Sequence, residues 1–233
     1  MSLLIIEHAE HRGDAIKQIV DDAHVNNKLV KTYLGEKLPK LDNFSGVISG
    51  GGPMGVYEMN NPKYNFLYEE SVYLQEAIDK GKAVLGICLG HQLLAKVLGG
   101  EIERDEKCRE TTWSKIKLTS EGLKDDLFKD VNNGALYSFQ YHYDKISIPP
   151  KDIKHLAYNN LTSIQAFRYN EQPVWGVQFH PEISPDMAKV ILNNNKDKLE
   201  KMGVDIFLAI DEGYKRDNGS RLQVFYNFLR LIK

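Results

Sequence analysis

Cysteine is scarce in this chain. Among 233 residues the sequence holds two cysteines, Cys88 and Cys108. A single potential pair in a chain of this length excludes a disulfide-stabilised scaffold. In a reducing compartment both thiols stay free, so either one is available for chemistry.

Long apolar runs are also lacking near the N-terminus. The first apolar run, Leu3 to Ile6, covers four residues. The apolar segment of a secretion signal or of a membrane-spanning helix is much longer. We therefore expect a cytoplasmic protein with no membrane partner.

The chain also has no large excess of charge of one sign. The chain has 30 Lys and Arg residues against 32 Asp and Glu residues, a formal net charge of −2. Nucleic-acid-binding proteins gather positive charge along one face or helix, and this sequence has no such run. The balance predicts no nucleic-acid partner.

Metal-ligand patterns are missing as well. His8, His11 and His24 lie near the N-terminus, but no cysteine or carboxylate pattern accompanies them at zinc-site spacing. We expect solvated or capping roles for these histidines, and neither a metal nor another cofactor. Cys108 has cationic neighbours but no strand-to-helix junction to present it, so we interpret it as incidental.

The sequence does contain an alternation of strand-like and helix-like segments. In the first hundred residues this alternation is typical of parallel β-α-β units. The strands expected there are 3–6, 28–33, 46–49 and 83–87, and the helices are 14–22 and 64–80. Further strands are expected near 111–118, 134–140, 155–158, 163–168 and 174–179, followed by two or three helices from Ser184 onward.

These segments predict an α/β fold. Apolar residues make up 42% of the chain and charged residues 27%, enough for a buried core and a solvated surface. Neither a linker nor an internal repeat divides the sequence. We therefore expect one domain over residues 1–233, with a mixed, mostly parallel central sheet flanked by helices, a β-rich second half and C-terminal helices.

The segment around Cys88 is the most informative motif. An apolar strand runs directly into an apolar helix, and Cys88 lies at the junction with Gly86 and Gly90 two residues to either side. Glycines at these positions permit the sharp turn of a nucleophile elbow. The helix start favours a thiolate and supplies donors for an oxyanion. The alternative is a buried structural cysteine.

A second motif is His180-Pro181-Glu182, which follows a strand-like run. Proline keeps His180 extended. Residues two apart in an extended chain face the same way, so Glu182 can orient or charge-stabilise the imidazole. The motif therefore offers a base with its orienting carboxylate, although a histidine at a strand end often serves only as a hydrogen-bonding residue.

A glycine-rich loop, Ser49 to Pro53, follows the expected strand at 46–49. Its three consecutive glycines allow backbone amides to approach a ligand closely. One of these amides, together with the amide of Leu89, would form a two-donor oxyanion hole. A phosphate-binding loop is the rival interpretation, but the Gly-Lys-Ser/Thr signature is missing. A plain flexible turn is the third.

These three motifs, in this order, resemble the class I glutamine amidotransferases, and most closely the stand-alone group similar to the glutaminase domain of GMP synthetase. The resemblance implies a flavodoxin-like fold. It also implies that Cys88 is the nucleophile, His180 the base and acid, and Glu182 the third member of the triad. Gly52 and Leu89 would supply the oxyanion amides.

The resemblance also implies substrate-binding residues. Gln92, one helical turn beyond Cys88, matches a position that helps to hold glutamine. The segment that clasps the α-amino and α-carboxylate groups matches Gln140 to Asp144, which nominates Tyr141, His142 and Tyr143. Relatives usually have His-Gly-Asp where this chain has His142-Tyr143-Asp144, so a tyrosine replaces a glycine in the pocket.

The implied reaction is hydrolysis of the glutamine side-chain amide to glutamate and ammonia through a cysteinyl thioester. The chain lacks the ATP-pyrophosphatase domain of a GMP synthetase, so one expectation is a synthetase subunit that binds in trans. The alternative is an independent hydrolase of γ-glutamyl peptides or amides. A third hypothesis is a non-catalytic regulatory module of the same fold, since a fold alone does not determine an activity.

Overall fold

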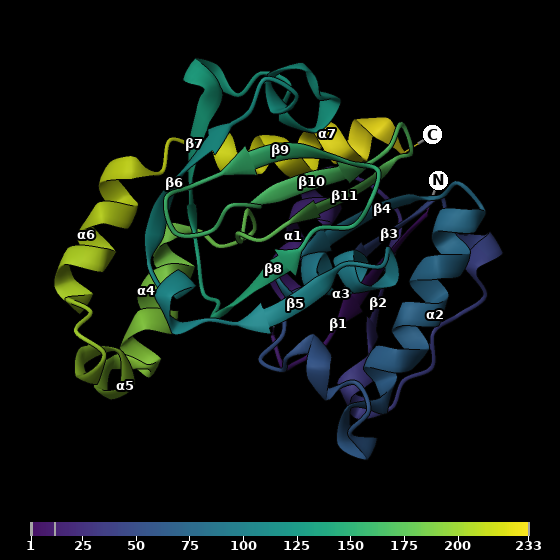
Figure 1. The fold of residues 1–233 in the computed structure, drawn as a ribbon, viewed down its shortest axis with the longest axis horizontal. Helices are drawn as coiled ribbons and strands as arrows, with labels where there is room; N and C mark the ends of the chain where they lie inside the picture. Colours follow the sequence, from purple (N-terminus) through teal and green to yellow (C-terminus); the bar gives the residue numbers. More distant parts are fainter. Residues whose placement is uncertain (1, 12, 233) are drawn as a thin grey trace.

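A large twisted sheet forms the centre of the molecule (Figure 1). The computed structural model describes residues 2–11 and 13–232. Within those residues nine strands make this sheet, in the order β2-β1-β3-β4-β11-β10-β9-β6-β7. Their bounds are β1 (Leu3–Glu7), β2 (Asn27–Lys31), β3 (Gly46–Ser49), β4 (Ala83–Ile87), β6 (Trp113–Leu118), β7 (Ala135–Phe139), β9 (Ile153–Tyr158), β10 (Ala166–Tyr169) and β11 (Val174–Val177).

Two halves of the sheet differ in strand direction. From β2 to β11 the neighbouring strands are parallel, and from β11 to β7 they are antiparallel. Every residue of β1 and β4 is buried, which explains their unbroken apolar sequences, because helices cover both faces of a parallel sheet. The predicted mixed, mostly parallel sheet with a β-rich second half is confirmed.

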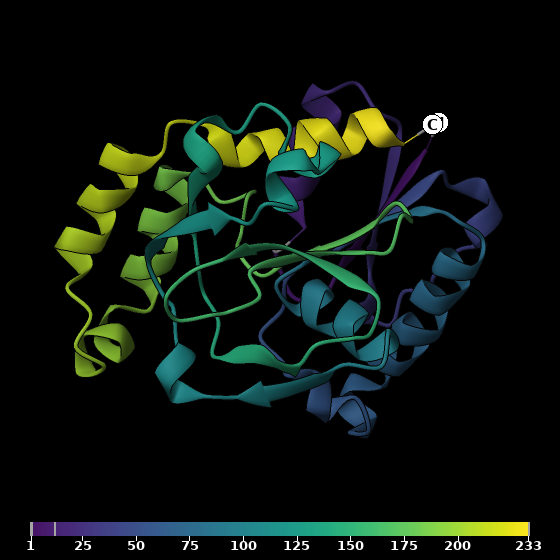
Figure 2. The same ribbon diagram turned by 45° about the horizontal axis from the view of Figure 1, so that its top comes forward.

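Helices cover both faces of the sheet. Across the part of the chain that the structure describes there are seven: α1 (Asp14–Asp22), α2 (Asn65–Asp79), α3 (Leu89–Val97), α4 (Pro185–Asn194), α5 (Lys196–Lys201), α6 (Ile206–Arg216) and α7 (Gln223–Leu231). One core lies between the sheet and α1 with α7, and another between the sheet and α2 with α3. Figure 2 shows α7, in yellow, on one side of the sheet and α2, in blue, on the other.

The C-terminal helices form a separate layer. Helices α4, α5 and α6 gather at the end of the molecule beyond β6, opposite α2 (Figure 1). Their apolar side chains pack around Trp113 and Phe139. The helical segment is interrupted at Asn195, Gly203 and Gly219, which gives four C-terminal helices where two or three were expected.

A second small sheet was not predicted. Strands β5 (Glu101–Arg104) and β8 (Asp144–Ile148) pair antiparallel. β5 is short and mostly exposed, and its sequence Glu-Ile-Glu-Arg carries one apolar residue, too few for a periodicity to register. In the described part of the chain, no helix is long and apolar enough to cross a membrane.

The topology brings the predicted motifs together at one edge. In a parallel sheet the carboxyl ends of the strands meet at the same edge, where ligands of α/β proteins bind. Cys88 follows β4, the glycine-rich loop follows β3, and His180 lies three residues beyond β11. The neighbouring order β1, β3, β4, β11 therefore places these segments side by side.

Candidate active site

Cys88 adopts the strained backbone of an elbow. Its φ is 52° and its ψ −101°, a region that residues other than glycine rarely occupy. The Cys88 N–H donates to the Val177 carbonyl at 2.9 Å, and the Cys88 carbonyl accepts from the Gln92 N–H at 3.1 Å. Strand β11 and helix α3 thus hold the turn from both sides.

The two glycines that flank the cysteine are required by close backbone approach. A Cβ on Gly86 would lie 2.4 Å from the Gly90 carbonyl oxygen, and one on Gly90 would lie 2.2 Å from the Ser49 carbonyl oxygen. Either contact is well inside van der Waals distance, so a larger residue would push strand and helix apart. The elbow spacing inferred from the sequence has this steric cause.

His180 contacts both Cys88 and Glu182. Its N–H donates to the Phe139 carbonyl at 2.9 Å, and its Nδ1 lies 2.7 Å from Glu182 Oε1. The Cys88 side chain is its neighbour, because a Cβ on Gly51 would lie within 3.6 Å of both groups. Burial alone would lower the pKa of His180, but the Glu182 carboxylate and the Cys88 sulfur raise it to about 10. At neutral pH the ring is therefore protonated, and its Nδ1–H donates to the Glu182 carboxylate.

An arginine from the C-terminal layer supports this loop. Arg221 is buried, and its Nη1 donates to the Pro181 carbonyl at 2.6 Å. Its Nε donates to Asp217 at 3.1 Å. Sequence reasoning missed Arg221, because it lies 40 positions from its partner Pro181 and no local pattern relates the two.

The glycine-rich loop lies against Cys88 and His180. The Gly50 carbonyl accepts from the Gly90 N–H at 3.1 Å. A Cβ on Gly51 would lie 2.8 Å from His180 Cε1 and 3.6 Å from Cys88 Cβ. A Cβ on Gly52 would lie 2.7 Å from the Leu89 side chain. The loop is therefore within contact of the cysteine, the imidazole and the first residue of α3.

A cavity of about 330 Å³ opens at the cysteine. Seven of the residues nominated from the sequence line it: Gly52, Cys88, Gln92, Tyr141, His142, Tyr143 and His180. The other two, Leu89 and Glu182, are buried and adjoin it through Gly52 and His180. All nine nominated residues thus lie at one site.

Charged residues that sequence reasoning did not single out also line the cavity: Glu58, Arg104, Asp144 and Lys198. The Tyr143 ring has the Arg104 guanidinium 4.6 Å and the Lys198 ammonium 5.2 Å from its centroid. Burial raises the pKa of Asp144, against the opposing effect of Arg104. The cavity wall therefore carries side chains of both signs.

His142 is oriented by a buried carboxylate. Its Nδ1 lies 3.0 Å from the Asp144 carbonyl oxygen, and its Nε2 lies 3.4 Å from Glu110 Oε2. Glu110 also accepts hydrogen bonds from Ser114, Asn159, Thr162 and Gln165. Burial opposes the charge of Glu110, yet His142, followed by Ser114 and Asn159, lowers its pKa. The Glu110 carboxylate fixes one face of the cavity.

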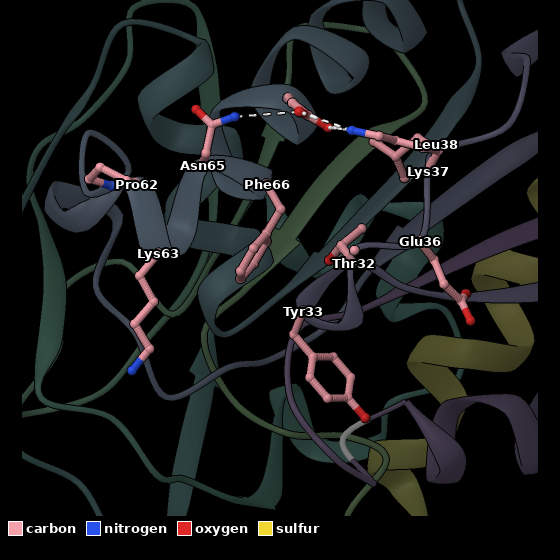
Figure 3. A pocket seen from close by; sticks show the side chains of 11 residues that line it. Thr32, Tyr33, Glu36, Lys37, Leu38, Pro62, Lys63, Asn65 and Phe66 are labelled. Atoms are coloured by element: carbon pink, nitrogen blue, oxygen red, sulfur yellow. Dashed lines mark hydrogen bonds and ion pairs between the residues drawn. The ribbon is translucent and has the colours of Figure 1, made fainter.

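A second pocket lies away from this site (Figure 3). Its volume is about 240 Å³, and it opens between residues 32–38 and the start of α2, from Pro62 to Glu69. Lys37 and Glu69 pair across it at 3.4 Å. None of the nine nominated residues lines it, and its wall carries no cysteine or histidine that could serve as a nucleophile or base.

The remaining sequence candidates fall outside the cavity. Cys108 is buried beside Asp105 at 3.7 Å, and burial raises the pKa of its thiol. His11 is exposed and pairs with Asp14 at 2.7 Å. The expectation for His8 was wrong: its ring is fully buried and lies 2.6 Å from Glu70. Over residues 2–11 and 13–232, no three histidine, cysteine or acidic side chains form a metal-binding group.

Comparison with protein families gives one match. The family described as glutamine amidotransferase class-I matches residues 5–198 of this chain. These residues contain all three motifs and every residue that lines the cavity.

Curated relatives carry related names. A glutamine-hydrolysing GMP synthase subunit of Methanococcus aeolicus is 37% identical over 139 residues, 60% of this chain and 65% of that protein. A GMP synthase subunit of Pyrococcus abyssi, of the same printed name, is 36% identical over 160 residues, covering 69% of this chain and 78% of that protein. The GMP synthase of Prochlorococcus marinus is 31% identical over 182 residues, and the aligned part spans only 32% of its length.

Solved structures agree in fold. A glutamine amidotransferase from Thermotoga maritima superposes with a TM-score of 0.86 and 28% identity, covering 100% of this chain and 97% of that one. A glutamine amidotransferase from Methylobacillus flagellatus has a TM-score of 0.81 at 19% identity, covering 100% and 95% of the two chains. At 19% identity the second likeness concerns the fold alone.

Proposed function

Because this chain belongs to the class I glutamine amidotransferases, we propose that it hydrolyses the side-chain amide of glutamine to glutamate and ammonia, with Cys88 as nucleophile. One observation carries the proposal. The buried imidazole of His180 lies 2.7 Å from the Glu182 carboxylate and lines the same cavity as Cys88. This arrangement is that of a nucleophile, a base and an orienting group.

In the first half-reaction the Cys88 sulfur attacks the amide carbon of glutamine. A C–S bond forms, and the carbonyl oxygen becomes an oxyanion, to which the amides of Gly52 and Leu89 donate. The proton held by His180 passes to the leaving nitrogen, the C–N bond breaks and ammonia departs. Glu182 stabilises the imidazolium until that transfer.

The second half-reaction frees the enzyme. After ammonia has left, His180 is neutral and takes a proton from water, which attacks the thioester carbon. The C–S bond breaks, glutamate leaves, and the proton returns to the pair formed by His180 and Cys88. Protons, atoms and charges balance over the cycle without a cofactor.

Substrate binding follows from the charges around the cavity. We assign Gln92, Tyr141, His142 and Tyr143 to the wall that holds the substrate, since all four line the cavity. Cationic groups beside Tyr143 suit an α-carboxylate, and acidic groups on the same wall suit an α-ammonium. The glutamine side chain then points toward Cys88.

The fate of the ammonia suggests a partner. Relatives that are named as subunits of GMP synthase support a synthetase subunit that binds in trans. We propose that residues 1–233 form a single glutaminase domain, because the cores on both sheet faces share the same strands. A free nucleophilic thiol is consistent with a reducing, cytoplasmic setting.

Independent hydrolysis of γ-glutamyl compounds is the second candidate. The bulky Tyr143 with its two cationic neighbours favours it, because a γ-glutamyl peptide carries an additional carboxylate. Ammonia release from free glutamine, measured beside glutamate release from γ-glutamyl dipeptides, separates the two functions. A higher kcat/KM for glutamine supports the glutaminase, and a higher value for the dipeptides supports the hydrolase.

The proposal is tested by replacing the nucleophile. Cys88→Ala should lower glutamine turnover by about 10⁴-fold or more, because the covalent route is lost. Cys108→Ala, which removes the other thiol, should leave turnover unchanged. Wild-type turnover by the Cys88→Ala protein would refute the assignment.

A further inference from the structure

A buried polar cluster lies beneath the glycine-rich loop and takes no part in the reaction described above. His8 Nε2 lies 2.6 Å from Glu70 Oε2, and the Ser49 hydroxyl donates to Glu70 Oε1 at 2.7 Å. All three residues are fully buried. Glu70, on α2, thereby links the residue that follows β1 to the last residue of β3.

Such a cluster needs a reason to exist. Burying an imidazole and a carboxylate costs hydration energy that their mutual attraction often only offsets, and well-packed apolar side chains would stabilise the same site equally well. Stability alone therefore does not account for His8 and Glu70. Their position next to the loop that contacts Cys88 indicates a role in shaping that loop.

The imidazole of His8 faces the loop backbone. Burial by itself would lower the pKa of His8, but Glu70, followed by the carbonyls of Gly51 and Gly50, raises it above its ordinary value. The Nδ1 atom is buried and makes no regular hydrogen bond within the described residues. This second ring nitrogen is therefore buried on the residue against which Gly52 packs, where a protonated ring has an N–H to offer to a loop carbonyl.

The geometry of a peptide unit links this contact to the oxyanion hole. In a trans peptide the carbonyl oxygen and the following N–H point in opposite directions. If the Gly51 carbonyl is drawn to the His8 side, the N–H of Gly52 is turned to the other side. We propose that the His8–Glu70 pair positions the Gly51–Gly52 peptide so that the Gly52 amide faces the oxyanion, a role that rests on the proposed function.

Neighbouring contacts make the pair rigid. A Cβ on Gly52 would lie 2.9 Å from His8 Cβ, so the loop rests directly on this residue. Phe66 stacks on the His8 ring with 6.3 Å between centroids. Phe66 also lines the pocket of Figure 3. The pair acts through the loop, so His8 and Glu70 are positioning residues.

The test compares two reactions of Cys88 that differ in their need for an oxyanion hole. Acylation by 4-nitrophenyl acetate passes through a tetrahedral oxyanion, whereas alkylation by iodoacetamide does not. In Glu70→Gln we expect acylation, and kcat for glutamine, to fall about 10- to 100-fold, the usual cost of misplaced groups. Alkylation and KM should stay unchanged. Glu69→Gln, at the exposed neighbouring position on α2, is the matched control.

The outcomes separate positioning from mere packing. If Glu70→Gln acylates at the wild-type rate, the inference is wrong, whatever its melting temperature. If Glu70→Gln does not fold, His8→Gln decides in its place, with the same expected fall in acylation and the same contrary result. Absence of glutamine turnover in the wild type would refute the proposed function only, because the ester and alkylation rates need no glutamine.

Discussion

The backbone of Cys88 has an energetic cost that its chemistry explains. A non-glycine residue in this region of φ and ψ stores about 1–3 kcal/mol of strain. This backbone conformation places Cys88 in the wall of the cavity, together with His180. Glycine at this position would relieve the strain and remove the proposed nucleophile.

Two substitutions at Cys88 therefore separate strain from chemistry. Both Cys88→Ala and Cys88→Gly should lack activity, but Cys88→Gly should be the more stable of the two by about 1 kcal/mol or more. Chemical denaturation measures this difference in the free energy of unfolding. Equal stability of the two variants, or a more stable Cys88→Ala, would show that the turn is not strained.

The raised pKa of His180 predicts an unusual pH profile. With a pKa of about 10, the ring stays protonated through the ordinary range near 6.5 and can supply the proton that the proposed mechanism passes to the leaving nitrogen. It loses this proton only as the pH approaches 10. The rate of enzyme acylation should therefore not change around pH 6.5 on account of His180, and should fall on the alkaline side near 10. The free energy of unfolding changes in the same direction. The raised pKa of His180 stabilises the folded state fully below pH 6.5, and this stabilisation is lost as the pH rises toward 10.

Glu182→Gln should move that alkaline limb to lower pH, because the carboxylate that raises the pKa of His180 is gone. At neutral pH its kcat should fall about 10²- to 10⁴-fold through loss of the imidazolium partner. Stopped-flow acylation over a pH series measures both effects. A limb that stays near 10 in this variant would mean that Glu182 does not control the imidazole.

At the residue scale, sequence reasoning located the groups whose signal is local. The glycines around Cys88 indicate a sharp turn, and the dipeptide after His180 indicates an extended backbone, each within a few positions. The turn at Cys88 and the closeness of His180 to Glu182 could therefore be inferred. His8 and Glu70 could not be paired, since 62 positions separate them and a histidine after a strand has many uses. Arg221 could not be paired with Pro181 for the same reason, since 40 positions separate them.

Among the elements, the junction of α6 and α7 bears directly on the site. It carries Arg221, which donates to the Pro181 carbonyl and to Asp217. The C-terminal helices therefore help to fix the position of the segment after β11 that contains His180. Removing the guanidinium would leave the Pro181 carbonyl and the Asp217 carboxylate without their partner.

Arg221→Ala should lower the free energy of unfolding by about 1–3 kcal/mol, the usual cost of orphaned buried polar groups. It should also lower kcat more than it raises KM, because His180 moves while the cavity wall stays. Arg230→Ala, at an exposed position on α7, is the control. Wild-type kcat in a folded Arg221→Ala protein would limit this residue to a structural role.

Element prediction succeeded where one pattern was strong. The strands β1, β3 and β4 and the helix α1 appear within a residue or two of their expected bounds, because fully buried runs and amphipathic turns leave clear periodicities. β5 and β8 were missed since both are short and their paired residues lie 40 to 47 positions apart. The Asp144 end of the substrate segment belongs to this unpredicted sheet.

On the scale of the whole molecule, the cavity is assembled from distant parts of the chain. Arg104 comes from β5, Tyr143 precedes β8 and Lys198 lies on α5. Their meeting around one aromatic ring depends on the packing of the C-terminal layer against the small sheet. Sequence motifs nominated Cys88, His180 and Glu182 but not this charged wall, because charged surface residues carry no positional signal by themselves.

Lys198→Met tests the charged wall without disturbing the core. Since exposed charge pairs contribute up to about 1 kcal/mol, KM should rise about 3- to 5-fold while kcat stays constant. Lys196→Met, two positions away on the same helix, should leave both parameters unchanged. Steady-state kinetics with glutamine and a γ-glutamyl dipeptide would also show which substrate depends more on this charge. An unchanged KM for both substrates would remove Lys198 from the binding wall.

The central claim is that Cys88, activated by His180, attacks the glutamine side chain. Treatment with a diazo-ketone analogue of glutamine, followed by peptide mapping by mass spectrometry, tests it most directly. We predict one adduct per chain, on the peptide that contains Cys88, formed in parallel with loss of glutamine turnover and slowed by added glutamine. Inactivation with the adduct on another residue, or full turnover by protein labelled at Cys88, would contradict the account.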